Sequence, residues 1–159
     1  MNAYDFRLAA SGDIPEIVRL YKSALDTPGC TWNADYPSRE TADADFQMQA
    51  LYVLKEKGAI IAAASAGAFD ELSHLPWKPK QPCELARIGV LPAMQKQGVG
   101  GVMLRHIICA MRQKGFDGIR MLVSKTNASA LALYEKFGFE RCGEAFLFDH
   151  DFYCYQLLI

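Results

Sequence analysis

A glycine-rich turn constrains what this chain can fold into more than any other feature. It covers residues 95–101, Gln-Lys-Gln-Gly-Val-Gly-Gly, and follows an apolar stretch at residues 85–90 that Pro92 ends. Apolar residues at helical spacing follow from Val102 to Met111. Glycines let several backbone N–H groups converge, and the helix that follows adds unpaired amides and the positive end of its dipole. The turn therefore predicts an anion site suited to a pyrophosphate.

Two well-known phosphate motifs do not fit this turn. A dinucleotide motif G-x-G-x-x-G that starts at Gly98 would need glycine or alanine where Met103 stands. A P-loop would need a glycine followed by Lys and then Ser or Thr, and the chain has no such run in that frame. Taken alone, the turn is also compatible with a purely structural role, in which glycines let a helix pack closely on a strand.

Hydrophobic periodicity divides the rest of the chain into strands and helices. Ser11 is expected to cap the first helix, with Pro15 and Glu16 in its first turn. The order β-α-α-β-β-β-α-β-α-β-β predicts an α/β domain, a mixed sheet with helices packed on it. The expected strands cover residues 4–9, 51–54, 59–65, 85–90, 119–123, 140–148 and 152–158, and the helices cover 14–26, 39–48, 102–115 and 127–137.

Size and composition exclude several classes of protein. With 159 residues, the chain has the length of a single domain, here taken as residues 1–159, and 51% apolar residues against 22% charged ones exclude general disorder. A net charge of −1 gives no broad basic surface for nucleic acid. No stretch reads as a signal peptide or a membrane span, so we expect a cytoplasmic protein without a membrane partner.

The cysteines and histidines give no sign of a disulfide framework or a metal site. Five cysteines lie far apart and include no C-x-x-C pair, which is typical of reduced thiols. His150 stands between Asp149 and Asp151, but adjacent residues of a strand point to opposite faces and rarely share an ion. We therefore expect no metal.

A second motif lies about thirty residues after the turn. The segment 127–139, Asn-Ala-Ser-Ala-Leu-Ala-Leu-Tyr-Glu-Lys-Phe-Gly-Phe, follows a predicted strand and forms a predicted helix closed by Gly138. Together with the turn, it resembles the GNAT superfamily of acetyl-CoA-dependent N-acetyltransferases. The family's patterns [QR]-x-x-G-x-[GA] and N-x-x-[AS]-x-x-L-Y-x-x-x-G-F are matched by Gln95, Gly98, Gly100, Asn127, Ala130, Leu133, Tyr134, Gly138 and Phe139.

The resemblance implies a fold and a cofactor site. The fold is a mostly antiparallel twisted sheet of about seven strands, splayed between strands four and five and flanked by about four helices. The pantetheine arm of acetyl-CoA would pair with the fourth strand at Ile88, Gly89 and Val90. Many family members carry Arg or Lys where this chain has Gln97, so Lys96 is the substitute cation. The pyrophosphate would lie on the amides of Gln95, Lys96, Gln97, Gly98, Val99, Gly100 and Gly101.

Two residues of the second motif have both a structural and a functional interpretation. Asn127 is a favoured helix N-cap, and the matching side chain in the family also reaches the cofactor arm. Tyr134 has the spacing of a buried aromatic residue, whereas the resemblance implies that its hydroxyl protonates the departing thiolate. We expect both residues to contact the cofactor.

The resemblance further implies transfer of an acetyl group from acetyl-CoA to a primary amine of a small molecule, peptide or protein. The amine must lose a proton and attacks the thioester directly, so no cysteine nucleophile is needed. Glu84, fourteen positions before Gly98, matches the catalytic glutamate of histone-type members and is the candidate base. The alternative interpretation of Glu84 is an exposed acid after a loop. The alternative function is an acyl-CoA sensor without turnover.

The acceptor groove in this fold would involve the loop after the first helix and the last two strands. Trp32 and Tyr36 are the candidate acceptor contacts, and an anchoring role for these aromatic residues is the alternative. Aromatic residues in the last strands are compatible with a homodimer. Further residues expected near the acceptor are Cys30, Asp35, Phe146, Asp149 and Asp151.

Overall fold

The centre of the sheet is built from apolar strands that are buried on both faces. The computed structural model describes residues 3–159. In β2 (Leu51–Glu56), Leu51 and Val53 face one layer of helices, whereas Tyr52 and Leu54 face the other. In β3 (Ala59–Gly67), three consecutive alanines are fully buried, and such small side chains let helices lie close on both sides.

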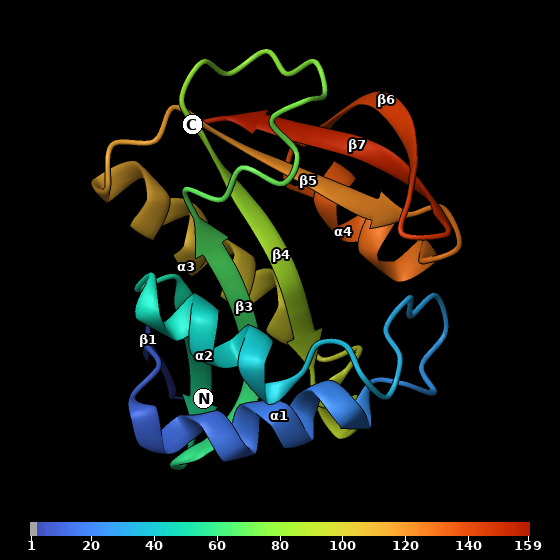
Figure 1. The fold of residues 1–159 in the computed structure, drawn as a ribbon. Helices are drawn as coiled ribbons and strands as arrows, with labels where there is room; N and C mark the ends of the chain where they lie inside the picture. Colours follow the sequence, from blue (N-terminus) through green and yellow to red (C-terminus); the bar gives the residue numbers. More distant parts are fainter. Residues whose placement is uncertain (1–2) are drawn as a thin grey trace.

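Seven strands form one sheet in the order β1-β2-β3-β4-β5-β7-β6. Neighbouring strands are antiparallel except for β4 and β5, whose parallel pairing covers only Pro82–Glu84 and Gly118–Arg120. Beyond this point the two strands have no ladder between them, and Figure 1 shows them diverging. The predicted mixed sheet with a splay between strands four and five is confirmed. The remaining strands are β1 (Tyr4–Leu8), β4 (Pro82–Val90), β5 (Gly118–Ser124), β6 (Glu140–Leu147) and β7 (His150–Leu158).

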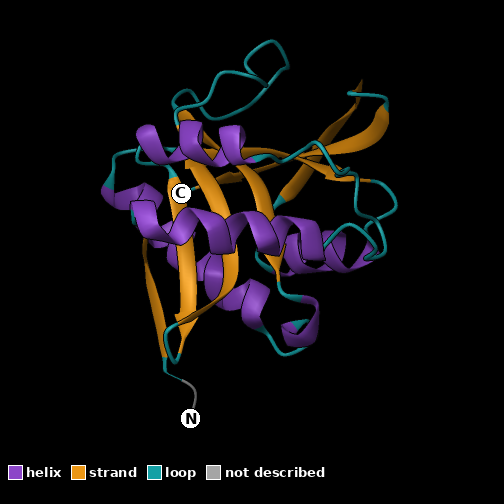
Figure 2. Ribbon diagram, turned by 60° about the horizontal axis from the view of Figure 1, so that its bottom comes forward, coloured by secondary structure: helices purple, strands orange, loops and turns teal. Residues whose placement is uncertain are grey.

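Four α-helices cover the two faces of the sheet, as expected (Figures 1 and 2). The helices α1 (Ile14–Ser23) and α2 (Arg39–Gln47) lie on one face, and α3 (Val99–Gln113) and α4 (Ala128–Lys136) lie on the other. Short 3-10 helices precede α1 and α3, at Ser11–Asp13 and Pro92–Met94. The loop that joins α1 to α2 runs beside the lower end of β4 in Figure 1.

Several predicted element ends are wrong. Ser11 does not cap α1 but begins a 3-10 helix, and Asp13 Oδ2 instead accepts the Ala10 N–H at 2.8 Å. The first helix ends at Ser23 rather than near residue 26. At this end, the Ser23 hydroxyl donates to the Leu20 carbonyl at 2.6 Å. β4 begins at Pro82, three residues before the predicted start at residue 85. Proline is tolerated there because the first residue of a strand need not donate a ladder hydrogen bond.

A β-bulge distorts β4 in the middle of its pairing with β3. Ser65 lies opposite Ala86, but Ala63 lies opposite Gly89, so β4 holds one residue more than β3 over this span. Arg87, inside the bulge, has the left-handed φ of 51°. The bulge gives the Arg87 side chain access to α2, on the same face as α1, where its hydrogen-bond partners lie.

Two further findings concern the described residues as a whole. All five cysteines lie among them, and each is a free thiol. Between residues 3 and 159, no helix has the length and hydrophobicity needed to cross a lipid bilayer.

Candidate functional site

The glycine-rich turn presents a row of backbone amides at the start of α3. Lys96 and Gly98 have φ values of 63° and 80°, which turn the chain so that the helix begins at Val99. The Gly98 carbonyl accepts the Val102 N–H at 3.1 Å, the first hydrogen bond of the helix. Within residues 3–159, the N–H groups of residues 96–101 have no hydrogen-bond acceptor. The turn thus has the donors that an anion needs.

Two glutamine side chains of the turn form hydrogen bonds that hold its shape. Gln95 Nε2 donates to the Val90 carbonyl at 3.4 Å, and Gln97 Nε2 donates to the Ala93 carbonyl at 3.0 Å. The Gln97 side chain therefore folds back on the preceding 3-10 helix. Lys96 is exposed and is the one cationic side chain in the segment 95–101.

The last two glycines of the turn also serve the packing of α3 on α4. A Cβ atom on Gly100 would lie 3.3 Å from Leu133 Cδ2, and one on Gly101 would lie 3.6 Å from the Phe137 ring. These two glycines therefore allow close packing between two helices rather than between a helix and a strand, and this packing leaves the amide row intact. This packing brings the middle and the C-terminal end of α4 next to the turn.

Tyr134 lies in the core at the inner face of α4. It is 2% exposed and packs edge-on against the rings of Phe139 and Tyr155, with centroid distances of 5.5 and 6.4 Å. Its hydroxyl has no hydrogen-bond partner within residues 3–159. Burial raises the pKa of Tyr134 well above its ordinary value, so the hydroxyl keeps its proton at neutral and moderately alkaline pH.

Asn127 caps α4 and touches the loop that follows α1. Its Oδ1 accepts the Ala130 N–H at 3.2 Å, which confirms the predicted N-cap. Gly29 lies so close that a Cβ there would be 2.6 Å from Asn127 Cα. This contact joins the predicted acceptor loop to the helix that carries Tyr134.

Glu84 lies at the point where β4 and β5 separate. It pairs in register with Arg120, and its Oε2 lies 2.7 Å from Arg120 Nη2. Its carboxylate also accepts the Leu72 N–H at 3.3 Å. Glu84 is 3% exposed, so the alternative interpretation of an exposed acid is wrong. The ion pair joins the two strands at the last position before the splay.

A groove of about 790 Å³ opens on the α1–α2 side of the splay. Aromatic side chains form much of its wall, and carboxylates and one guanidinium lie at its base. Trp32 and Tyr36 line the groove as predicted. The lining residues are Thr31, Trp32, Asn33, Tyr36, Thr41, Ala44, Asp45, Glu71, Leu72, Glu84, Leu85, Ala86, Arg87, Leu122, Phe148, His150 and Phe152.

The other residues expected near the acceptor do not line this groove. Along β7, His150 and Phe152 face the groove, so Asp151 between them does not, and Asp149 in the preceding turn also lies outside the lining. Phe146 is 66% exposed on β6, and the groove wall is instead formed by Phe148 in the β6–β7 turn. Cys30 and Asp35 also lie outside the lining.

A buried ion pair that the sequence did not reveal lies at the base of the groove. Arg87 Nε and Nη2 donate to the two oxygens of Asp45 at 2.7 and 2.8 Å. Arg87 Nη1 donates to Tyr36 Oη at 3.1 Å. The Ser65 hydroxyl donates to Asp45 Oδ2 at 2.5 Å. The network links β3, β4, α2 and the loop that carries Tyr36.

Comparison with known proteins decides the family. The family model described as the Acetyltransferase (GNAT) family matches residues 17–139, more than half of the chain. This chain belongs to the GNAT acetyltransferase family. The predicted resemblance is confirmed.

The relatives of this GNAT chain include N-acetyltransferases of archaea and bacteria. The N-alpha-acetyltransferase of Sulfolobus acidocaldarius is 29% identical over 141 residues, which cover 86% of this chain and 79% of the relative. The ribosomal protein bS18-alanine N-acetyltransferase of Escherichia coli K12 is 40% identical over 55 residues, 35% of this chain and 37% of the relative.

Solved structures share the fold of this GNAT chain. The ribosomal-protein-S18-alanine N-acetyltransferase of Escherichia coli superposes with a TM-score of 0.78 at 22% identity, covering 99% of this chain and 94% of that one. The yncA protein of Salmonella typhimurium, solved with its cofactor acetyl-CoA, gives a TM-score of 0.79 at 21% identity, covering 98% and 94%.

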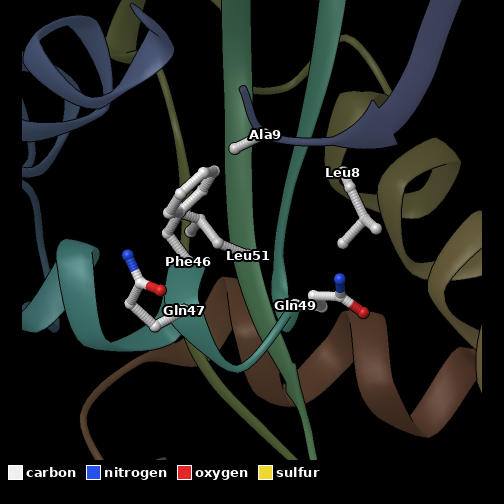
Figure 3. A pocket seen from close by; sticks show the side chains of 6 residues that line it. All are labelled: Leu8, Ala9, Phe46, Gln47, Gln49 and Leu51. Atoms are coloured by element: carbon white, nitrogen blue, oxygen red, sulfur yellow. The ribbon is translucent and has the colours of Figure 1, made fainter. Parts of the chain in front are cut away.

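A smaller cavity of this GNAT chain, about 230 Å³, lies away from the splay (Figure 3). None of the described residues that line it carries an ionisable side chain, so it offers no acid or base. They are Leu8, Ala9, Phe46, Gln47, Gln49 and Leu51.

Proposed function

We propose that this chain transfers an acetyl group from acetyl-CoA to a primary amine by direct attack in a ternary complex. The observation that carries the proposal is the row of unpartnered amides at residues 96–101, beside strands that diverge at Glu84. The family and the N-acetyltransferase relatives support the same reaction. Acetyl-CoA supplies the acetyl group as an activated thioester.

The residues present fit the cofactor. Amides at the start of a helix stabilise a pyrophosphate by hydrogen bonds and by the helix dipole, and Lys96 adds a positive charge. Among the described residues, β4 has no ladder partner on its β5 side beyond Glu84, so its backbone at Ile88–Val90 could pair with a pantetheine amide, which would compete with Gln95 for the Val90 carbonyl. Asn127, at the start of α4, would lie along the same arm.

Tyr134 is the proposed acid. A hydroxyl whose pKa is raised by burial stays protonated and can donate to the thiolate that leaves. Glu84 is the proposed recipient of the amine proton. Because its carboxylate is held by Arg120 and the Leu72 amide, we assign the proton transfer to a water molecule between Glu84 and the amine.

The test is acetyl-CoA turnover by two variants with matched measurements of stability. Tyr134→Phe should lower kcat by about 10²-fold with coenzyme A affinity unchanged, since general acid catalysis contributes that much. Tyr153→Phe, which removes a partly buried hydroxyl outside the proposed site, is the control. Because the pKa of Tyr134 is raised, wild-type kcat should not fall between pH 8 and 10 through loss of the Tyr134 proton. Wild-type turnover by Tyr134→Phe would contradict the acid role.

Glu84→Gln tests the base separately. We expect a lower kcat and an altered pH–rate profile, with thermal unfolding measured to show that the variant is folded. An unchanged profile would remove Glu84 as the base. Coenzyme A binding without thiol release, across a broad panel of amines, would instead favour a sensor.

A further inference from the structure

We propose that the groove selects amines that carry no neighbouring carboxylate, such as the amino terminus of a peptide, and discriminates against free amino acids. The inference rests on the proposed function and names the class of its acceptor. It follows from the described residues that line the groove, which include no lysine and no unpaired arginine to bind a substrate carboxylate.

The one guanidinium among the described residues that line the groove is already neutralised. All three nitrogens of Arg87 donate hydrogen bonds, two to Asp45 and one to Tyr36. The side chains of Arg87 and Asp45 are each 5% exposed, so water does not replace these contacts. Pairing Arg87 with a substrate carboxylate would leave Asp45 buried without its partner, which is strongly unfavourable.

The remaining carboxylates give the groove a net negative charge. Glu84 is neutralised by Arg120 at 2.7 Å. Glu71 also lines the groove, is exposed, and has no ion-pair partner within residues 3–159. An ammonium group is attracted to Glu71, whereas a carboxylate attached to the same acceptor is repelled.

Tyr36 supplies a contact that suits an amide. Because Tyr36 Oη accepts a hydrogen bond from Arg87, its own hydrogen is free to donate to a neutral oxygen such as a peptide carbonyl. The ring also lines the groove beside Trp32. Together, Tyr36 and Glu71 favour an ammonium group followed by an uncharged amide.

The experiment is an internal competition between phenylalaninamide and phenylalanine, with acetyl-CoA at pH 8. The product ratio, measured by mass spectrometry, equals the ratio of kcat/KM. We expect a preference of about tenfold or more for the amide, typical of a like-charge penalty in a partly desolvated site. Equal rates, or a preference for the free acid, would overturn the proposal.

Variants of Glu71 test whether its negative charge causes the preference for the amide. Glu71→Gln should reduce the preference to about threefold, and Glu71→Lys should favour the free acid, because the sign of the interaction reverses. Asp5→Asn also removes one negative charge, but Asp5 lies in β1, at the far edge of the sheet. This variant should leave the ratio of amide to acid products unchanged. An unaltered ratio in Glu71→Lys would contradict the assignment.

Binding is measured separately from turnover by saturation-transfer NMR on the same mixture with coenzyme A. Stronger saturation of the amide than of the acid supports the inference even if no product forms, and the lack of product then counts against the proposed function alone. Equal saturation of both compounds overturns the inference while leaving the proposed function intact.

Discussion

At the scale of single residues, two buried ion pairs shape the groove and the point where β4 and β5 separate. A buried pair need not stabilise a protein relative to apolar residues, but removal of one member leaves a costly uncompensated charge. Arg87–Asp45 orients Tyr36 at the groove, and Glu84–Arg120 joins the strands at the splay. Each pair therefore couples the shape of the site to the stability of the fold.

Asp45 and Asp43 offer a matched comparison on one helix. Asp45→Asn should lower the free energy of unfolding by about 3–5 kcal/mol, because it leaves the buried guanidinium of Arg87 without its counterion. Asp43 is 51% exposed and lies 3.8 Å from Arg39, so Asp43→Asn should cost less than about 0.5 kcal/mol. Urea denaturation of both variants measures the difference. Equal small losses would contradict the expected cost of leaving the Arg87 guanidinium without Asp45.

Sequence patterns indicated the aromatic residues of the groove but not its buried ion pair. Trp32 and Tyr36 were predicted to contact the acceptor, and both line the groove. Arg87 and Asp45 were not predicted to lie together, because a bulge in β4 brings them into contact and no local pattern reveals a bulge. A signal was present, since Arg87 is the one charged residue in the predicted apolar strand at residues 85–90, but its partner lies 42 residues away.

At the scale of elements, the loop between α1 and α2 contacts the start of α4. This contact holds the proposed acceptor groove against the proposed cofactor site. Gly29 makes this contact with a φ of 78°, and its Cα lies against the Asn127 backbone. Any side chain at position 29 must displace the loop or the start of α4.

Gly29→Ala and Gly58→Ala separate backbone strain from steric displacement. Both glycines have φ near 80°, but a Cβ on Gly58 would meet no atom within 4 Å. Gly58→Ala should cost about 1–2 kcal/mol through the left-handed conformation alone. Gly29→Ala should cost at least about 1 kcal/mol more, because the added methyl also displaces close neighbours. Thermal and urea unfolding of both variants report the difference, and equal losses would mean that the loop and α4 adapt freely.

Predictions were best for elements with strong periodicity and poorest at their ends. The β2–β3 hairpin, α3 and α4 follow from apolar spacing and a glycine stop, and all are present. The predicted Ser11 cap of α1 was wrong, although the helix begins at Ile14 as expected; Asp13 instead accepts the Ala10 N–H and forms an ion pair with Lys55 at 2.8 Å. That pair joins the beginning of α1 to β2, so a local capping rule could not anticipate it.

At the scale of the molecule, the splayed sheet places the amide turn and the groove on opposite sides of one opening. α3 and α4 lie on one face and α1 and α2 on the other, with β4 between them (Figures 1 and 2). Under the proposed function, a donor at the turn would reach an acceptor in the groove through the opening between β4 and β5. The order of elements along the chain predicted only a mixed sheet with helices packed on it, and the splay was implied by the resemblance.

The central claim is that the amides of residues 96–101 bind the pyrophosphate of coenzyme A. The most direct test is calorimetric titration of coenzyme A into the wild type, Gly98→Ala and Gly58→Ala. Gly98 has a φ of 80° and open space around it, so an alanine there strains the turn without a core clash. We expect micromolar binding by the wild type, about tenfold weaker binding by Gly98→Ala, and no change in Gly58→Ala. No heat with the wild type, or equal affinity in all three proteins, would contradict the account.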